Sequence, residues 1–182
     1  MINLRLGAHH QNDEGAERLL KLIRKHPGCC DRVWFSTLYG FPLLETHRQA
    51  AEKAKAAAQE YRKNNITVDL QISNTIGHGE YMKKYDNSAP NAYDLEPLVG
   101  HDATVAKYCF CWRGENFLNY IRQMVSIYVQ QLMPDTVWID DDLRPDNHYP
   151  VMIGCFCDNC IAEFCSMYGR TFTRKELVEE IN

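Results

Sequence analysis

Residues 136–142 have the sequence Thr136-Val137-Trp138-Ile139-Asp140-Asp141-Asp142. The apolar run is too short for a helix and is typical of a buried strand, which would end in three carboxylates. A loop over Leu143–Gly154 leads into Cys155-Phe156-Cys157-Asp158-Asn159-Cys160, and a helical pattern then runs to Tyr168. Because the chemistry of α/β proteins usually lies at the C-terminal ends of the strands, this segment predicts both a class of fold and the position of a site.

The rest of the chain repeats the same succession of strand and helix. Alternating or continuous apolar residues predict strands over 2–7, 32–39, 66–72 and 136–139. Apolar residues at helical spacing predict helices over 14–25, 44–64 and 116–132, a fourth helix that ends at Tyr168, and a short closing helix over 173–181. Asp13 is the expected N-cap of the first helix, and Thr173 with Glu176 forms a capping box for the last. The segment 80–113 reads as a long irregular loop.

The order β-α-β-α-β-α-β-α predicts an α/β fold with parallel strands and right-handed crossovers, in one domain over residues 1–182. Two architectures fit: a small doubly wound sheet, or four βα units forming the N-terminal half of a (β/α)8 TIM barrel, since a complete barrel needs about 200 residues or more. No glycine-rich phosphate loop follows the first strand, which disfavours a nucleotide-binding sheet. A half barrel leaves open sheet edges, so we expect association, with homo-oligomers as one form, and partial exposure of Val68, Leu70, Val137 and Ile139.

Composition narrows the classes of partner. The 182-residue chain has a formal net charge of -4, which gives no electrostatic reason to expect nucleic acid or an anionic membrane as partner. No apolar stretch approaches the roughly 20 residues that span a bilayer. Residues 1–6 show no basic segment ahead of a long apolar core, so a cytoplasmic location is expected. In that compartment eight cysteines favour a metal site over disulfides.

The densest group of cysteines predicts a structural zinc site. Zinc takes four ligands in a tetrahedron, and Cys155, Cys157 and Cys160 supply three thiolates. Cys109 and Cys111 are both candidates for the fourth, because they precede the helix that leads into the 136–139 strand. Cys165 is expected to be a core residue. An iron–sulfur cluster is disfavoured because the sequence carries no other feature of electron transfer.

Polar residues follow each predicted strand, and in a parallel sheet these ends converge on one edge. The candidates are His9, His10, Asn74, His78, Asp140, Asp141, Asp142, Arg144 and His148. Converging carboxylates and imidazoles suit proton transfer or the binding of a polyhydroxylated ligand. The structural alternative is that these aspartates cap loops and these histidines only form hydrogen bonds. A further alternative is a magnesium site at the three aspartates, for phosphoryl chemistry.

The motif of a tryptophan and acidic residues, a loop, and Gly-Cys-x-Cys-x-x-Cys-Ile-Ala-x-Phe resembles glycoside hydrolase family 42, the β-galactosidases. In that family a cysteine six residues before an aromatic residue completes the zinc site, and here Cys111 lies six residues before Phe117. The resemblance covers most of the chain, and its specific feature is the cysteine spacing. It implies a (β/α)8 barrel, a retaining mechanism, a carbohydrate substrate, and zinc held by Cys111, Cys155, Cys157 and Cys160.

The chain departs from that family where the acid/base should stand. The family has an Asn-Glu pair, and an ungapped match sets Asp142 at the asparagine and Leu143 at the glutamate. The family's nucleophile would lie beyond residue 182, so we expect the N-terminal half of a glycosidase-like barrel. Asp142 and Asp141 are the catalytic candidates, and the other polar strand ends are substrate-binding candidates. Alternation along the strand sets Asp140 and Asp142 on the side of Trp138. A non-catalytic carbohydrate- or metal-binding module is the alternative function.

Overall fold

A four-stranded parallel sheet forms the centre of the protein. The computed structural model describes residues 1–140, 143–144 and 146–181. The strands β1 (Asn3–Arg5), β2 (Arg32–Ser36), β3 (Thr67–Ile72) and β6 (Val137–Ile139) pair in the order β1-β2-β3-β6, so neighbours in the sheet follow one another along the chain. All three pairings are parallel, with Val33 opposite Val68 and Leu70 opposite Val137. The predicted α/β class with a parallel sheet is therefore confirmed.

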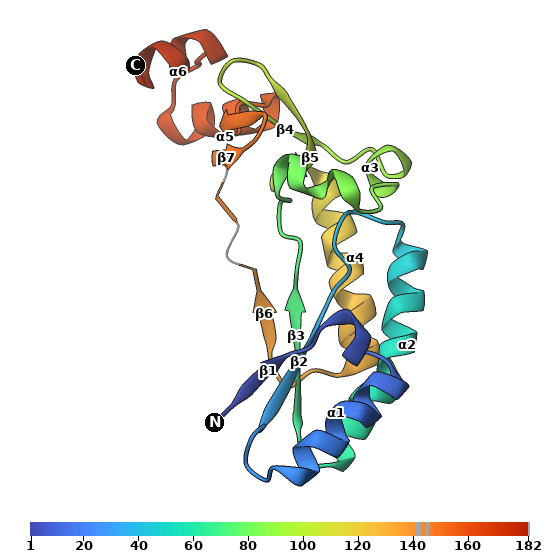
Figure 1. Cartoon of the computed structure of the whole chain (residues 1–182). Helices are drawn as coiled ribbons and strands as arrows, with labels where there is room; N and C mark the ends of the chain where they lie inside the picture. Colours follow the sequence, from blue (N-terminus) through green and yellow to red (C-terminus); the bar gives the residue numbers. More distant parts are fainter. Residues whose placement is uncertain (141–142, 145, 182) are drawn as a thin grey trace.

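Three helices lie together on one side of this sheet (Figure 1): α1 (Asp13–Lys25), α2 (Leu44–Lys63) and α4 (Glu115–Leu132). The alternating residues that face them form the core, and Val33, Phe35, Val68 and Leu70 are fully buried there. The expectation that Val68 and Leu70 would be partly exposed is wrong, because their side chains point toward the helices. Val137 and Ile139 on the outer strand are 40% and 65% exposed, as expected for an uncovered edge.

The other face of the sheet carries polar and aromatic side chains. Arg32 forms an ion pair with Asp69 at 3.2 Å, and only 2% of the Asp69 side chain is exposed. The indole Nε1 of Trp138 donates to the same carboxylate at 3.2 Å, and Trp138 packs edge-on against Trp34 with ring centroids 5.7 Å apart. Figure 1 shows no helix of the described part of the chain over this face.

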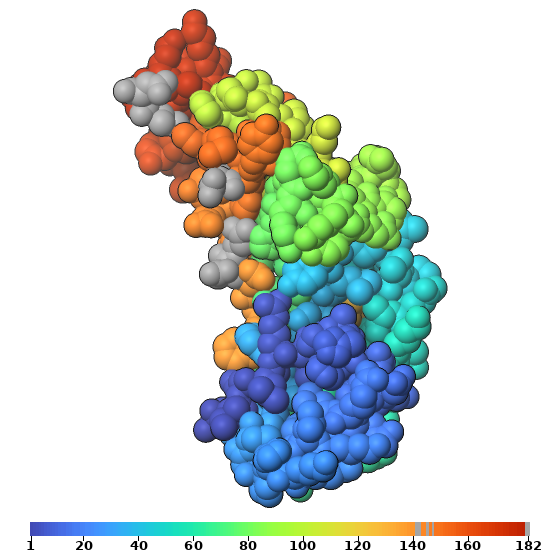
Figure 2. All heavy atoms as spheres, viewed as in Figure 1, coloured from blue at the N-terminus to red at the C-terminus, as the bar shows by residue number. Residues whose placement is uncertain are grey.

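A separate arm (residues 97–110 and 146–181) extends beyond the C-terminal ends of the strands and gives the molecule an elongated outline (Figure 2). It contains two antiparallel hairpins and two helices: β4 (Pro97–Val99) with β5 (Val105–Phe110), β7 (Asp146–His148) with β8 (Val151–Ile153), α5 (Asp158–Tyr168) and α6 (Arg174–Ile181). Leu98, Ala106, Cys109 and Val151 form a small core of its own.

The segment predicted as irregular, residues 80–113, is more ordered than expected. It contains the hairpin of β4 and β5, and before it the short helices η2 (Gly79–Lys84) and α3 (Ala89–Ala92). Isolated bridges from Gly77 to Cys109 and from Gly100 to Gly154 join it to neighbouring segments. The irregular appearance of the sequence reflects short strands and turns that are stabilised by distant partners.

Helix ends mostly follow the sequence signals. The Thr173–Glu176 capping box is confirmed: the Thr173 backbone N–H donates to Glu176 Oε2 at 2.8 Å, and the Glu176 backbone N–H donates to Thr173 Oγ1 at 3.3 Å. The N-cap of α1 is Asn12 rather than the predicted Asp13, since Asn12 Oδ1 accepts from the Gly15 backbone N–H at 2.9 Å. Of the helices that the structure describes, none is long and apolar enough to cross a membrane.

Candidate metal centre and strand-end site

Four cysteine sulfurs meet where the arm joins the rest of the molecule. The Sγ atoms of Cys111, Cys155, Cys157 and Cys160 all lie within 4.8 Å of one another. The Cys111 sulfur is 3.4 Å from that of Cys160 and 3.6 Å from that of Cys157. Four thiolates around one zinc ion at about 2.3 Å would be about 3.8 Å apart, so the four sulfurs can hold a metal ion after small adjustments.

Each of these cysteines is positioned by the end of a secondary-structure element. Cys111 follows β5 directly and is buried, Cys155 lies shortly after β8, Cys157 is the N-cap of α5, and Cys160 lies in the first turn of α5. Backbone N–H groups point at two of the sulfurs, since Val99 donates to Cys155 Sγ at 3.5 Å and Arg113 donates to Cys111 Sγ at 3.4 Å. Such donors stabilise thiolates, which are the metal-binding form of cysteine.

When no cation lies between them, the four thiols strongly shift one another's pKa values. Hydrogen bonds from Cys111 and Cys160 lower the pKa of the Cys155 thiol far below its usual value, to about 2. The hydrogen bond with Cys155 raises the pKa of the Cys111 thiol to about 12, and hydrogen bonds with Cys111 and Cys155 raise that of the Cys160 thiol further still. One thiolate is therefore favoured, and its negative charge opposes ionisation of the others. A bound cation would remove that opposition and bring all four sulfurs to the thiolate form.

The structure decides between the two candidates for the fourth ligand. Cys111 belongs to the four-sulfur group, whereas the buried Cys109 sulfur accepts a hydrogen bond from the Gly79 backbone N–H at 2.9 Å. Cys165 also lies outside the group, and its sulfur accepts from the Phe172 backbone N–H at 3.1 Å. All eight cysteines are free thiols, in accord with the expectation of a metal site rather than disulfides.

At the end of β6, Asp140 projects from the polar face of the sheet, on the same side as Trp138. The amide Nε2 of Gln71 on the neighbouring strand donates to Asp140 Oδ2 at 3.2 Å, which fixes the carboxylate beside β3. The contacts of Trp138 and Asp140 thus agree with the prediction that both side chains lie on the same face of the sheet. The catalytic candidates Asp141 and Asp142 lie outside the described residues.

Two other candidates lie at the end of β3 and bind backbone. Asn74 is buried, and its amide donates to Leu38 O at 2.8 Å and also to Gly40 O, so it anchors the loop after β2. The Asn74 Oδ1 atom has no hydrogen-bond partner among the described residues. The half-buried His78 ring lies 3.4 Å from Ser73 O through Nε2. These contacts show how the structure holds both side chains. Their role in binding sugar stays a prediction.

The remaining candidates are divided between two regions. His9 and His10 form the short helix η1 (Ala8–His10) after β1, with ring centroids 3.9 Å apart, and burial lowers the pKa of His10, with a smaller contribution from His9. Arg144 and His148 lie toward the arm, where the buried His148 ring contacts Arg144 O at 2.7 Å. No contact of the described residues brings these two pairs together, so the predicted convergence holds only within each region.

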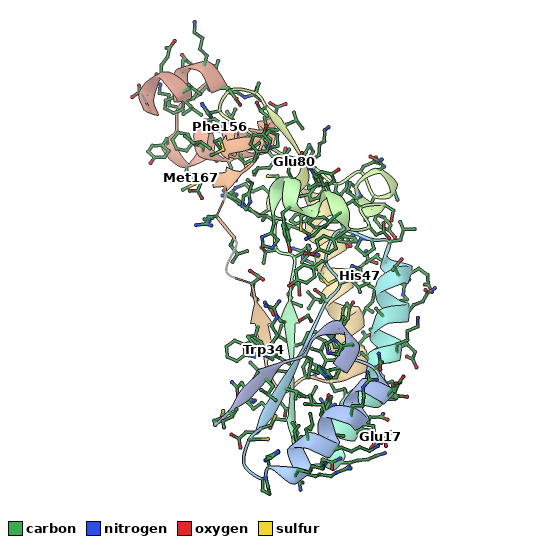
Figure 3. The ribbon with its side chains drawn as sticks, in the orientation of Figure 1. Glu17, Trp34, His47, Glu80, Phe156 and Met167 are labelled. Carbon is green, nitrogen blue, oxygen red and sulfur yellow. The ribbon has the colours of Figure 1, made fainter. Side chains whose placement is uncertain are left out.

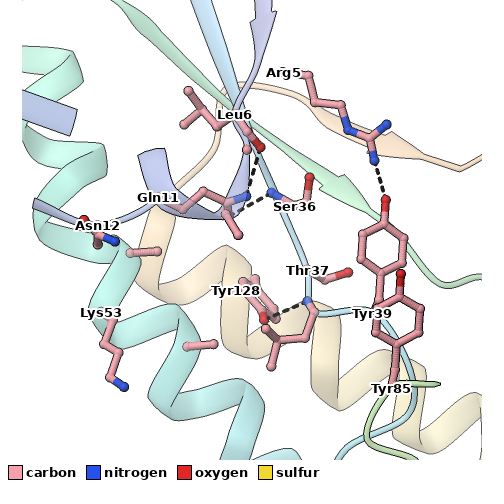
Figure 4. Close-up of a pocket in the computed structure, with 15 residues that line it drawn as sticks. Arg5, Leu6, Gln11, Asn12, Ser36, Thr37, Tyr39, Lys53, Tyr85 and Tyr128 are labelled. Carbon is pink, nitrogen blue, oxygen red and sulfur yellow. Dashed lines mark hydrogen bonds between the residues drawn. The ribbon is translucent and has the colours of Figure 1, made fainter. Parts of the chain in front are cut away.

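A cavity lies at the ends of β1 and β2, and the sequence did not indicate it. It has a volume of about 690 Å³ and is lined by residues of β1 and β2, of the loops that follow them, of α2 and α4, and by Tyr85 after η2 (Figure 4). Gln11 and Asn12, which directly follow the predicted His9 and His10, line it, as do Arg5, Tyr39 and Tyr85. The available signal in the sequence was the position of residues 8–12 directly after a strand.

No protein-family model matches the chain, and no curated protein matches its sequence. The resemblance to glycoside hydrolase family 42 therefore depends on the tryptophan–aspartate and cysteine motifs. The cysteine cluster, the polar sheet face and the cavity are the features of the molecule that bear on its function.

Proposed function

We propose that Cys111, Cys155, Cys157 and Cys160 bind one zinc ion, and that its role is structural. The proximity of their four sulfurs carries this proposal. Four cysteine ligands complete the tetrahedral shell of zinc and leave no position for water or substrate, which is the pattern of structural rather than catalytic zinc sites. The ion would tie the start of α5 to the segment between β5 and α4, and so fix the arm beside the strand ends.

The parallel sheet is, in our proposal, the N-terminal half of a (β/α)8 barrel of the glycoside hydrolase type, with carbohydrate bound at the C-terminal ends of its strands. Two features support it. The strands pair in chain order with their helices on one side, as in a barrel wall. The opposite face carries the indole rings of Trp34 and Trp138 and, after β6, the carboxylate of Asp140, groups suited to a polyhydroxylated ligand.

In this proposal Asp142 is the first candidate for the acid–base group and Asp141 the second, while Asp140 helps to bind sugar hydroxyls with Asn74 and His78. A non-catalytic carbohydrate-binding module is the second candidate function. The observation in its favour is Leu143, which takes the position of the family's glutamate and is 54% exposed at the strand end. An aliphatic side chain there cannot transfer a proton.

Metal analysis tests the zinc proposal directly. The purified chain is expected to contain one zinc ion, and Cys160→Ser is expected to lose it, because three thiolates and a hydroxyl bind zinc more weakly than four thiolates. Cys165→Ser is the matched control, since Cys165 lies in the same helix but outside the four-sulfur group. Zinc-free wild-type protein, or equal zinc content in the two variants, would contradict the assignment.

Glycoside turnover separates the two candidate functions. In a preparation that hydrolyses glycosides, Asp142→Asn is expected to lower the rate by about 100-fold or more, the usual loss on removing acid–base help. Circular dichroism establishes that the variant is folded. Near-normal turnover in the folded variant would remove Asp142 from the mechanism, and binding of sugars without any turnover would favour the non-catalytic module.

A further inference from the structure

The cavity at the ends of β1 and β2 has the properties of a preformed ligand site. Its volume of about 690 Å³ falls within the range of small-molecule pockets. Leu38 and Ser36 in its wall are fixed through their backbone: the Leu38 N–H donates to Tyr128 Oη at 3.3 Å, and the Ser36 N–H donates to Gln11 Oε1 at 3.2 Å. Gln11 also donates to Leu6 O at 3.2 Å, which links the wall to the end of β1. A ligand would therefore meet groups that are already held in place.

One side of the cavity is an aromatic wall. Tyr39 and Tyr85 stack with their ring centroids 5.3 Å apart and their planes inclined by 24°, and both line the cavity. The guanidinium of Arg5 donates to Tyr39 Oη at 2.6 Å, and this hydrogen bond fixes the guanidinium beside the aromatic wall (Figure 4). Aromatic faces provide apolar area for the C–H surface of a ligand, while the hydroxyl groups remain able to form hydrogen bonds.

The charge of the cavity has one sign. Arg5 and Lys53 are the charged side chains among its lining residues, and no aspartate or glutamate lines it. Neither cation forms an ion pair in the described part of the chain, although Lys55, two residues along the same helix, pairs with Glu52 at 4.0 Å. Figure 4 shows Lys53 on α2, across the view from Tyr39 and Tyr85. Two cations without carboxylate partners at one cavity, in a chain whose net charge is -4, favour an anionic ligand.

We propose that this cavity binds an anionic sugar, whose carboxylate or sulfate group is held by Arg5 and whose ring packs on Tyr39 and Tyr85, while Lys53 adds positive charge from the α2 side. The inference rests on the proposed carbohydrate function and specifies its ligand class. Asn12 and Thr37 also line the cavity and offer amide and hydroxyl groups for the ring hydroxyls. The site lies at the carboxyl ends of two parallel strands, where ligands of α/β folds usually bind.

Calorimetric titration of the zinc-loaded chain with galacturonic acid, galactose 6-sulfate and galactose tests the inference. At least one anionic sugar is expected to bind about tenfold more tightly than galactose, the contribution of one charge-assisted hydrogen bond. Lys53→Gln and Arg5→Gln are each expected to reduce that preference severalfold. Lys55→Gln is the matched control, because it removes a charge from the same helix outside the cavity.

The outcomes separate the inference from the function on which it rests. Equal affinity for the charged and neutral sugars, or a preference that survives both cavity variants, overturns the anionic site and leaves carbohydrate binding intact. Failure of all three sugars to bind overturns the inference and counts against the carbohydrate function. A preference for galacturonic acid alone or for galactose 6-sulfate alone supports the site and identifies carboxylate or sulfate as its anion.

Discussion

His47 is a buried histidine whose hydrogen bonds require the neutral ring, and this makes the stability of the fold depend on pH. It lies between α2 and α4 (Figure 3), with Nδ1 3.2 Å from Tyr128 Oη and Nε2 3.0 Å from Tyr120 Oη. Tyr120 donates its proton to Pro42 O at 2.8 Å, so it accepts from Nε2–H of the histidine. Tyr128 accepts from the Leu38 N–H and is left to donate to Nδ1. The chain of donors and acceptors is complete with a neutral ring, and a proton on Nδ1 would remove the acceptor of the Tyr128 hydroxyl proton.

The size of this pH-dependent change in stability follows from the pKa of the His47 ring. Burial lowers the pKa of His47 from 6.5 to about 4, and the smaller influence of Asp86 opposes the change. The unfolded chain therefore binds a proton at higher pH than the folded protein does. The stabilisation is fully present above pH 6.5 and is lost as the pH falls toward 4. At about 1.4 kcal/mol per pH unit, a gap of about 2.5 units corresponds to a loss of about 3 kcal/mol of unfolding free energy.

Urea unfolding of wild-type protein and His47→Gln, followed by tryptophan fluorescence between pH 4 and 7.5, measures this loss. Glutamine can replace one donor and one acceptor of the ring but does not titrate. The wild type is therefore expected to lose about 3 kcal/mol more than the variant over that range. His26→Gln, at an exposed position, is the control and should keep the wild-type slope. Parallel slopes for wild type and His47→Gln, or an NMR titration that gives His47 an ordinary pKa, would refute the argument.

Three further predictions concern the metal, the sheet face and association. Chelation of the metal is expected to speed proteolytic cleavage within residues 146–181 and to leave α1, α2 and α4 protected. Mass spectrometry of the fragments measures this, and an unchanged cleavage pattern contradicts the anchoring role of the metal. Asp69→Ala is expected to lower the unfolding free energy by about 3 kcal/mol, because it leaves the Arg32 charge without its partner. Glu14→Ala, which breaks an exposed pair, should change it far less, and equal effects would contradict the argument. The open β6 edge predicts self-association in light scattering, and a monodisperse monomer would count against a half barrel.

The sheet and its helices were accessible from the sequence because their signals are local. Alternation in residues 66–72 predicted β3, whose observed bounds are Thr67–Ile72, and helical periodicity predicted α2 and α4 to within one residue at each end. The two hairpins of the arm were missed for a physical reason. Their strands mostly have only three residues, and their stability comes from pairing across turns and from bridges to distant segments. The strands β1 and β6 are equally short, but the residue runs that contain them, 2–7 and 136–139, carried the pattern that predicted them.

The site was predictable to the extent that its residues are close in sequence. The spacing of Cys155, Cys157 and Cys160 was sufficient to predict a metal site, but the choice between Cys109 and Cys111 from the residues alone required the fold. The cavity could not be foreseen, because its charged and aromatic residues come from elements that are far apart along the chain. The same applies to the chain of hydrogen bonds through His47, whose partners are 73 and 81 residues away.

Helix α4 begins next to the metal centre but is capped independently of it. Its N-cap Gly114 offers no side chain, and the carboxylate of Glu96 takes that role by accepting from the backbone N–H groups of Asn116 and Phe117, each at 3.0 Å. A negative charge at this end also interacts favourably with the helix dipole. A Cβ at Gly114 would lie 2.4 Å from Glu96 Oε2, so the glycine makes room for this cap.

This cap determines how the loss of metal should affect the rest of the protein. Helix α4 carries Tyr120 and Tyr128, whose hydrogen bonds to Pro42 and Leu38 hold the loop after β2, and that loop lines the cavity. Since Glu96 fixes the start of the helix without the metal, chelation should free the arm while the helix, the loop and the cavity keep their positions. The metal centre and the cavity are therefore separable by experiment: sugar binding at the ends of β1 and β2 should survive treatment that makes residues 146–181 sensitive to protease.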